Sequence, residues 1–187
     1  MKKFLAGVIV GIAVIIGGVY AYFSGGYAPV ATASRPMPFE RKLASLALHA
    51  RLDKEMPKAA PIEANEANYL AGAHEYLINC AVCHGVPGKA PTAVALGMFP
   101  KPPELLHGKG VTDDTPGETY WKVANGIRLT GMPGFKNSLS ETQMWQVSLL
   151  LANADKLPGS VAAVLAAPSE SSATTPPAAA TKPASPK

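Results

Sequence analysis

Cysteine is scarce in this sequence, in which only Cys80 and Cys83 occur among 187 residues. A structural zinc site takes four ligands, so two thiolates would need a chance approach of His74 and His107 to complete one. A thioredoxin-like C-x-x-C motif needs a βαβ setting, and no alternation of strand and helix patterns surrounds Cys80. The shortage of cysteine therefore argues against a zinc site and against a dithiol redox site.

A surface for binding nucleic acid is missing too. Such a surface combines a basic stripe with interleaved aromatic residues, and the sequence has none despite its net charge of +4. Residues 1–58 contain eight lysines and arginines against three acids, whereas residues 59–157 contain seven against nine. The positive charge thus lies near the N-terminus, and we expect no nucleic-acid partner. No nucleophile or acid–base group for catalysis is evident either.

The two cysteines belong to the pentapeptide Cys80-Ala81-Val82-Cys83-His84, a C-x-x-C-H motif that marks the attachment of c-type haem. Positions i, i+3 and i+4 share one face of a helix, so both thiols and the imidazole point the same way. Two thiols can then bond the two vinyl groups of one porphyrin while His84 ligates the iron. A local disulfide would leave His84 unexplained. We therefore predict one covalently bound haem c, held by Cys80 and Cys83, with His84 as an axial ligand.

The other axial position is predicted to be filled by Met132, which lies between a glycine and a proline. A thioether is a soft ligand suited to haem iron, and this constrained loop lies far enough along the chain to return over the opposite haem face. Five other side chains with a suitable sulfur or nitrogen atom are rivals: Met98, Lys101, His107, Lys109 and Met144.

Residues 4–23 form an uncharged run of 20 residues, preceded by Lys2 and Lys3. Twenty helical residues span about 30 Å, the thickness of a bilayer core, and the lysines place the N-terminus in the cytoplasm. A cleaved signal peptide is the alternative, with Ala31-Thr32-Ala33 as a small-x-small site. Because the run is long and that site lies far from it, we predict a retained single-pass anchor in a bacterial inner membrane, with the haem domain in the periplasm.

Residues 39–56 are predicted to form a helix, because Phe39, Leu43, Leu46 and Ala50 recur at i, i+4, i+7 and i+11. Two placements remain open for it. The helix lies on lipid headgroups or against a partner subunit, or it packs on the haem domain of its own chain.

Helical patterns dominate the rest of the chain and predict an all-α fold. Residues 63–79 place Tyr76 on an apolar face, and a glycine inside this helix, Gly72, costs about 1 kcal/mol relative to alanine. Close approach of another helix would justify that cost. The expected partner is the helix of residues 141–154, which carries Trp145.

Two helices of this region are predicted to begin at N-terminal capping motifs. Thr115-Pro116-Gly117-Glu118 and Ser140-Glu141-Thr142-Gln143 both predict capping boxes, in which the side chains of the first and fourth residues bond reciprocally to backbone N–H groups.

Residues 85–114 form a long stretch rich in proline and glycine, which we expect to wrap the porphyrin. A backbone carbonyl within residues 99–103 is expected to accept the Nδ1 proton of His84 and to fix its tautomer. Trp121 and Arg128 are candidates to bond a haem propionate, with core packing as the alternative role for Trp121.

The sequence thus divides into four predicted parts. Residues 1–27 are the transmembrane anchor, and residues 28–62 are a periplasmic linker with an amphipathic helix. Residues 63–157 are the haem domain. Residues 158–187 are predicted to be a disordered tail rich in Ala, Pro, Ser and Thr. Residues 161–167 are expected to be at most transiently helical, and the remainder of the tail cannot bury enough apolar surface to become ordered.

Residues 64–157 resemble a small bacterial class I cytochrome c domain, of the kind also found in third subunits of cbb3-type oxidases. The resemblance lies in Gly72 and Tyr76 ahead of the C-x-x-C-H-G run, in Met132-Pro133, and in a last helix with Trp145. It implies that the first and last helices cross at the glycine and the aromatic residue, and that Met132 is the distal ligand.

The expected function is that of a membrane-anchored monohaem cytochrome c, which carries single electrons between redox protein partners. A six-coordinate iron exchanges electrons without binding substrate, so we expect a carrier and not an enzyme. Two alternatives remain open. The chain is a dedicated subunit of a larger membrane oxidase or dehydrogenase complex, or it is a ligand-binding haem protein with an open sixth site.

Overall fold

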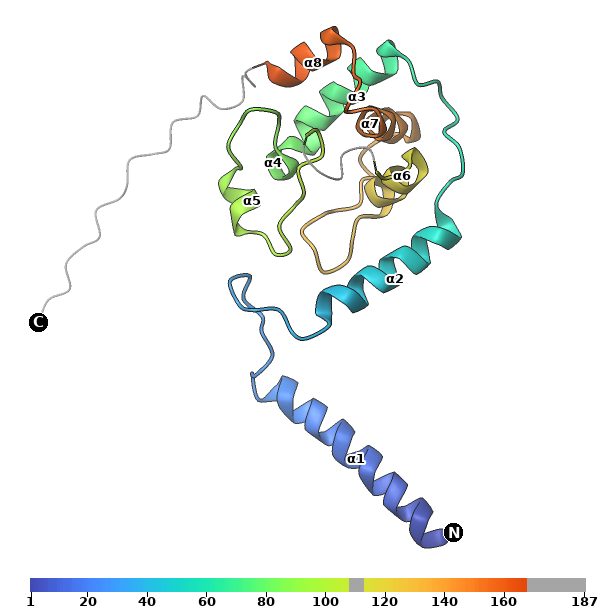
Figure 1. The fold of residues 1–187 in the computed structure, drawn as a ribbon, viewed down its shortest axis with the longest axis vertical. Coiled ribbons are helices and arrows are strands. Elements are labelled where there is room, and N and C mark those ends of the chain that lie inside the picture. The colour runs from blue at the N-terminus through green and yellow to red at the C-terminus, as the bar shows by residue number, and fades with distance from the viewer. Residues whose placement is uncertain (108–112, 168–187) are drawn as a thin grey trace, which may run out of the picture.

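The computed structural model of the protein describes residues 1–107 and 113–167, and regular structure within them is entirely helical. The prediction of an all-α fold is therefore confirmed. The chain order, shown in Figure 1, is α1 (Lys2–Ser24), α2 (Glu40–Glu55), α3 (Glu66–Asn79), α4 (Ala81–His84), α5 (Ala93–Gly97), α6 (Pro116–Asn125), α7 (Glu141–Ala152) and α8 (Gly159–Ala166). We refer to α3 through α8 with their loops as the helical body.

Helices α3 and α7 cross at the centre of the helical body. A Cβ atom on Gly72 would collide with the carbonyl oxygen of Gln146, so only glycine allows the two backbones to approach this closely. Ala73 and Tyr76 of α3 and Val147 of α7 are fully buried beside the crossing. The predicted contact between these helices is confirmed, and its cause is the missing side chain on α3.

Helix α6 packs against α7 and begins at a capped N-terminus. The Thr115 side chain accepts a hydrogen bond from the Glu118 N–H over 3.2 Å. The predicted reciprocal bond of the Glu118 carboxylate is wrong, because that group pairs with Lys122 at 3.0 Å. The second predicted capping box is confirmed, since the side chains of Ser140 and Gln143 each bond the other residue's backbone.

The C-terminal tail becomes ordered for longer than its composition predicts. Residues 159–166 form α8, which packs against α3. Val161 and Leu165, four residues apart and so on one helix face, are buried there, and Ser160 bonds to Glu66. Residues 161–167, for which we predicted at most a transient helix, thus lie mostly within a docked helix, because Val161 and Leu165 are buried and Val164 packs against the core beside them. Residues 168–187 lie outside the described part of the chain.

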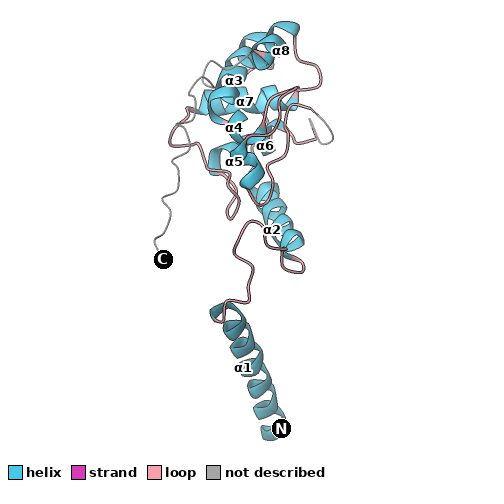
Figure 2. Cartoon of the chain, turned by 90° about the vertical axis from the view of Figure 1, so that its left-hand side faces the viewer, coloured by secondary structure: helices cyan, strands magenta, loops and turns pink. Residues whose placement is uncertain are grey.

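Helix α1 stands apart from the helical body, as Figure 2 shows, and none of its residues is buried. By length and composition this helix can cross a membrane. It includes the whole of the uncharged run at residues 4–23. In water the apolar side chains of such a helix would be exposed, which is unfavourable. In a lipid bilayer the same side chains contact the apolar lipid tails.

A haem site beside helix α4

Helix α4 brings both thiols and the imidazole of the C-x-x-C-H motif to one cavity. The His84 N–H donates to the Cys80 carbonyl over 2.9 Å, which closes the helical turn. Gly85 then ends the turn at a φ of 72°, in the left-handed region that glycine adopts without strain. The Tyr76 hydroxyl, held on α3, donates to the Gly85 carbonyl over 2.8 Å and fixes this exit.

The cavity is mostly apolar, has a volume of about 230 Å³ and opens to solvent. Val123, Val147 and Leu151 line it from α6 and α7, and Pro102 and Leu105 line it from the long loop. The predicted loop around the porphyrin thus forms part of the wall of this cavity.

His84 is oriented by the loop that crosses over it. Its Nδ1 atom lies 2.8 Å from the carbonyl oxygen of Pro103, which confirms the prediction of an accepting carbonyl within residues 99–103. Burial lowers the pKa of His84, while the bond to Pro103 raises it, and the net shift is downward. The imidazole is therefore neutral at neutral pH, with its proton on Nδ1 and its Nε2 lone pair available to a metal.

The Cys80 thiol is strongly protected against ionisation. Burial, the Glu75 carboxylate and Cys83 together raise its pKa to about 12. Since the thiolate and not the thiol is the reactive form, the folded site keeps this sulfur unreactive near neutral pH.

Two thioethers face the same cavity from opposite loops. Met132 lies on a loop closed by two hydrogen bonds, from its own N–H to the Thr130 hydroxyl (3.1 Å) and from the Ile127 N–H to its carbonyl (3.2 Å). The Met98 side chain also lines the cavity, and its methyl group fills the space beside Gly131. The structure thus brings Met132 to the same cavity as Cys80, Cys83 and His84, and its role as an axial ligand stays a prediction.

The structure reduces the number of rival ligands. Lys101 lines the cavity as Met98 does. His107 pairs with Glu104 at 2.9 Å and Met144 is buried in the core; neither lines the cavity. Lys109 lies outside the described residues.

The polar edge of the cavity was not anticipated from the sequence. Trp121 donates its indole N–H to Glu55 over 3.1 Å, and neither Trp121 nor Arg128 is among the residues that line the cavity. Thr119 and Lys122 line it instead, from the same helix.

Lys122 is held by two carboxylates, Asp114 at 2.6 Å and Glu118 at 3.0 Å. Burial lowers the pKa of Lys122, but these hydrogen bonds outweigh burial and raise it. The Glu118–Lys122 spacing of i, i+4 was the only sequence signal for this cation.

The residues present fit a haem group. Two thiols and an imidazole converge from one short helix, and two thioethers line the same mostly apolar space. Nowhere in the described part of the chain do three or more histidine, cysteine or acidic side chains form a cluster that could hold a metal ion.

Of three comparisons with known proteins, the match to a family bears on this site. Residues 67–149 match the family described as cytochrome C oxidase, cbb3-type, subunit III, a match that extends from α3 into α7. The search of curated proteins found no match. Among solved structures, the chain is similar to a chain of the Kuenenia stuttgartiensis reducing HAO-like protein complex Kustc0457/Kustc0458, with 21% identity and a TM-score of 0.45. That similarity covers 72% of this chain, and this chain spans 54% of the length of that one.

The family match covers the motif helix, the loop over His84, the methionine loop and most of the helix that crosses α3. Together, the family match and the cavity support a class I cytochrome c haem domain over residues 67–149, and such a domain implies haem binding and electron transfer.

Proposed function

We propose that this protein is a membrane-anchored monohaem cytochrome c, which carries single electrons between redox protein partners on the periplasmic side of a bacterial inner membrane. In this proposal Cys80 and Cys83 bind one haem c covalently, and His84 and Met132 are its axial ligands. One observation carries the proposal: a single apolar cavity is lined by both thiols, the imidazole and a loop-borne thioether.

A bound haem supplies an iron atom that gains and loses one electron. The chain's own residues set the conditions for that exchange. The Pro103 carbonyl holds His84 in one tautomer, and a thioether ligand raises the reduction potential relative to a second nitrogen ligand. Apolar side chains of α6 and α7 shield the site from water, so the iron of a bound haem would change its charge in a low-dielectric environment.

The cellular placement follows from the N-terminal helix. Lys2 and Lys3 precede the apolar run, and cytoplasmic ends of membrane spans are enriched in lysine and arginine. With this orientation the helical body lies outside the cytoplasm, where the partners would be other periplasmic or membrane-bound redox proteins.

Replacing each cavity methionine in turn tests the ligand assignment. In Met132→Ala we expect loss of the sulfur-to-iron charge-transfer band of the oxidised protein, rapid binding of carbon monoxide to the reduced protein, and a lower reduction potential. The expected shift is tens to hundreds of mV, because axial ligands tune haem potentials over roughly 0.8 V.

The matched control is Met98→Leu, which removes the other thioether from the same cavity and should leave the band in place. If the band survives in Met132→Ala and disappears in Met98→Leu, Met98 is the ligand. If the unmodified protein binds carbon monoxide rapidly, the sixth site is open and the protein is a ligand-binding haem protein.

A further inference from the structure

Helix α2 has apolar side chains on two opposite faces. With 3.6 residues per turn, Leu48 and Leu52 share one face, and Leu43 and Leu46 lie on the other. Leu52 is 2% exposed, whereas Leu43 and Leu46 are 63% and 66% exposed. The helix therefore uses one apolar face within the chain and leaves the other uncovered.

The inward face of α2 is fixed to the helical body by contacts at its C-terminal end. Glu55 accepts the Trp121 indole N–H at 3.1 Å, and a Cβ atom on Gly117 would collide with the carbonyl oxygen of Pro57, so the chain beyond α2 lies directly on α6. These contacts leave α2 no freedom to turn its outer face inward. We call that outer face the outer stripe; it consists of Phe39, Leu43, Leu46 and Ala50.

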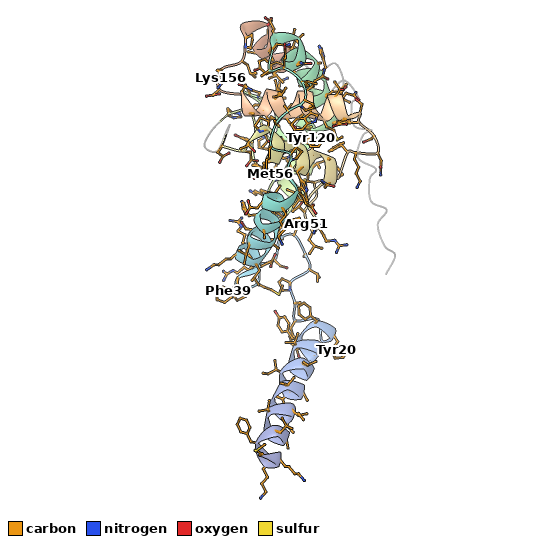
Figure 3. The ribbon with its side chains drawn as sticks, turned by 90° about the vertical axis from the view of Figure 1, so that its right-hand side faces the viewer. Tyr20, Phe39, Arg51, Met56, Tyr120 and Lys156 are labelled. Atoms are coloured by element: carbon orange, nitrogen blue, oxygen red, sulfur yellow. The ribbon has the colours of Figure 1, made fainter. Side chains whose placement is uncertain are left out.

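The outer stripe lies on the face of α2 opposite the buried Leu52. Figure 1 shows α2 running across the direction of α1, with the helical body on one side of α2 and α1 on the other. Figure 3 places Phe39 at the end of α2 that is nearer to α1. Residues 29–36 of the connecting linker also border a groove with Phe99 and Leu129, so the linker lies against the helical body.

The charges around α2 suit an anionic surface. Residues 35–58 contain six lysines and arginines against three acids, a net charge of +3. Two of the acids are already engaged, since Glu40 accepts the Met37 N–H and Glu55 pairs with Arg51 at 2.7 Å. An apolar stripe with flanking cations is the pattern of helices that lie in the headgroup region of anionic membranes.

We propose that α2 lies on the anionic surface of the membrane that α1 crosses, with the outer stripe inserted among the lipid headgroups. This inference rests on the proposed anchoring by α1. It assigns the lipid surface as the occupant of the stripe, because the stripe is tethered beside the bilayer. Docking would hold the helical body, and with it the haem cavity, in one orientation above the membrane.

Site-directed spin labelling tests the proposal on the haem-loaded full chain. The protein is inserted into phosphatidylcholine vesicles with or without phosphatidylglycerol, with a nitroxide at Leu46→Cys on the stripe or at Ser45→Cys, an exposed position away from it. With the anionic lipid, the Leu46 label should collide mainly with oxygen dissolved in the bilayer, and the Ser45 label mainly with a nickel chelate in water.

A second pair of variants measures the same contact without a label. Leu43→Glu combined with Leu46→Glu should abolish the linear dichroism of haem absorption in oriented bilayers. Burying one leucine shifts an equilibrium constant at least about tenfold, so losing two lowers the equilibrium constant for docking at least about a hundredfold. The control, Ser45→Glu combined with His49→Glu, adds the same charge off the stripe and should keep the dichroism.

The outcomes separate this inference from the proposed function. A Leu46 label that is as accessible to nickel as the Ser45 label, in protein that resists a carbonate wash, overturns lipid docking and leaves the anchor intact. A Leu46 label shielded from both reagents even in detergent overturns it in favour of a second copy or a partner protein. Protein that washes off the vesicles overturns the anchor and the docking together, while its haem spectrum still tests electron carriage.

Discussion

At the scale of single residues, the hydroxyl of Tyr76 has the widest set of consequences. It is buried on α3 and donates to the Gly85 carbonyl, directly after His84. Burial, with smaller contributions from Cys80 and Glu104, raises the pKa of Tyr76 far above its ordinary value. One hydrogen bond thus connects the crossing of α3 and α7 to Gly85, the residue that follows the C-x-x-C-H motif.

Replacing Tyr76 by phenylalanine should lower the free energy of unfolding of the haem-loaded protein by about 1–2 kcal/mol, because the Gly85 carbonyl loses its partner. The measurement is denaturant unfolding at neutral pH. The control is Tyr69→Phe on the same helix; equal losses in both variants would contradict the role given to this bond.

The same residue predicts a loss of stability in alkali. The unfolded chain releases the Tyr76 proton near its ordinary pKa of 10.0, whereas the folded protein retains it. The unfolded state then binds fewer protons, so stability is unaffected below about pH 10 and falls as the pH rises above it. Thermal unfolding between pH 8 and 12 should show a shallower fall for Tyr76→Phe than for the unmodified protein.

Residue types and spacing reveal the motif but not its surroundings. C-x-x-C-H, the proline-flanked Met132 and the need for a carbonyl over His84 could all be predicted, because each depends on local spacing or on one chemical requirement. The partners of Trp121 and Lys122 could not. Glu55 lies 66 residues from Trp121, and which acid a surface tryptophan meets is decided by tertiary packing.

At the scale of helices, the crossing of α3 and α7 depends on one missing methyl group. Gly72→Ala should lower the free energy of unfolding by about 1–3 kcal/mol, the usual cost of forcing an extra carbon into a packed interface. Gly97→Ala on α5 is the matched control, because a Cβ atom there meets nothing within 4 Å. Urea unfolding of both haem-loaded variants decides the matter, and a neutral Gly72→Ala would show that the two helices separate without cost.

The helices also show where patterns of sequence lead to a wrong or incomplete prediction. The alanine-rich composition of residues 161–167 indicates a transient helix, but it does not reveal that Val161 and Leu165 become buried and dock α8. In α2 the predicted apolar face turned out to be the outer one, because Leu48 and Leu52 form a second face that packs inward. Periodicity reveals that a face exists but not what covers it.

At the scale of the whole molecule, the proposed anchor would distinguish this protein from a free carrier. The intact mass of the mature protein should equal all 187 residues plus one haem, and carbonate should not extract it from membranes. A mature chain that begins at Ser34, after Ala31-Thr32-Ala33, would show instead that α1 is a cleaved signal. Deleting residues 1–27 behind a separate export signal should yield a water-soluble protein with an unchanged visible spectrum.

The rigid attachment of α2 to the helical body limits how far this cytochrome can search for a partner. Residues 25–39 join Ser24 to Glu40, and residues 29–36 of this linker border a groove on the helical body. Even fully extended, the fifteen residues span at most about 54 Å, at roughly 3.3–3.6 Å each. Because the haem domain stays this close to its anchor, its effective concentration near a neighbouring membrane protein is high. A more distant partner must first diffuse along the membrane to reach the haem domain.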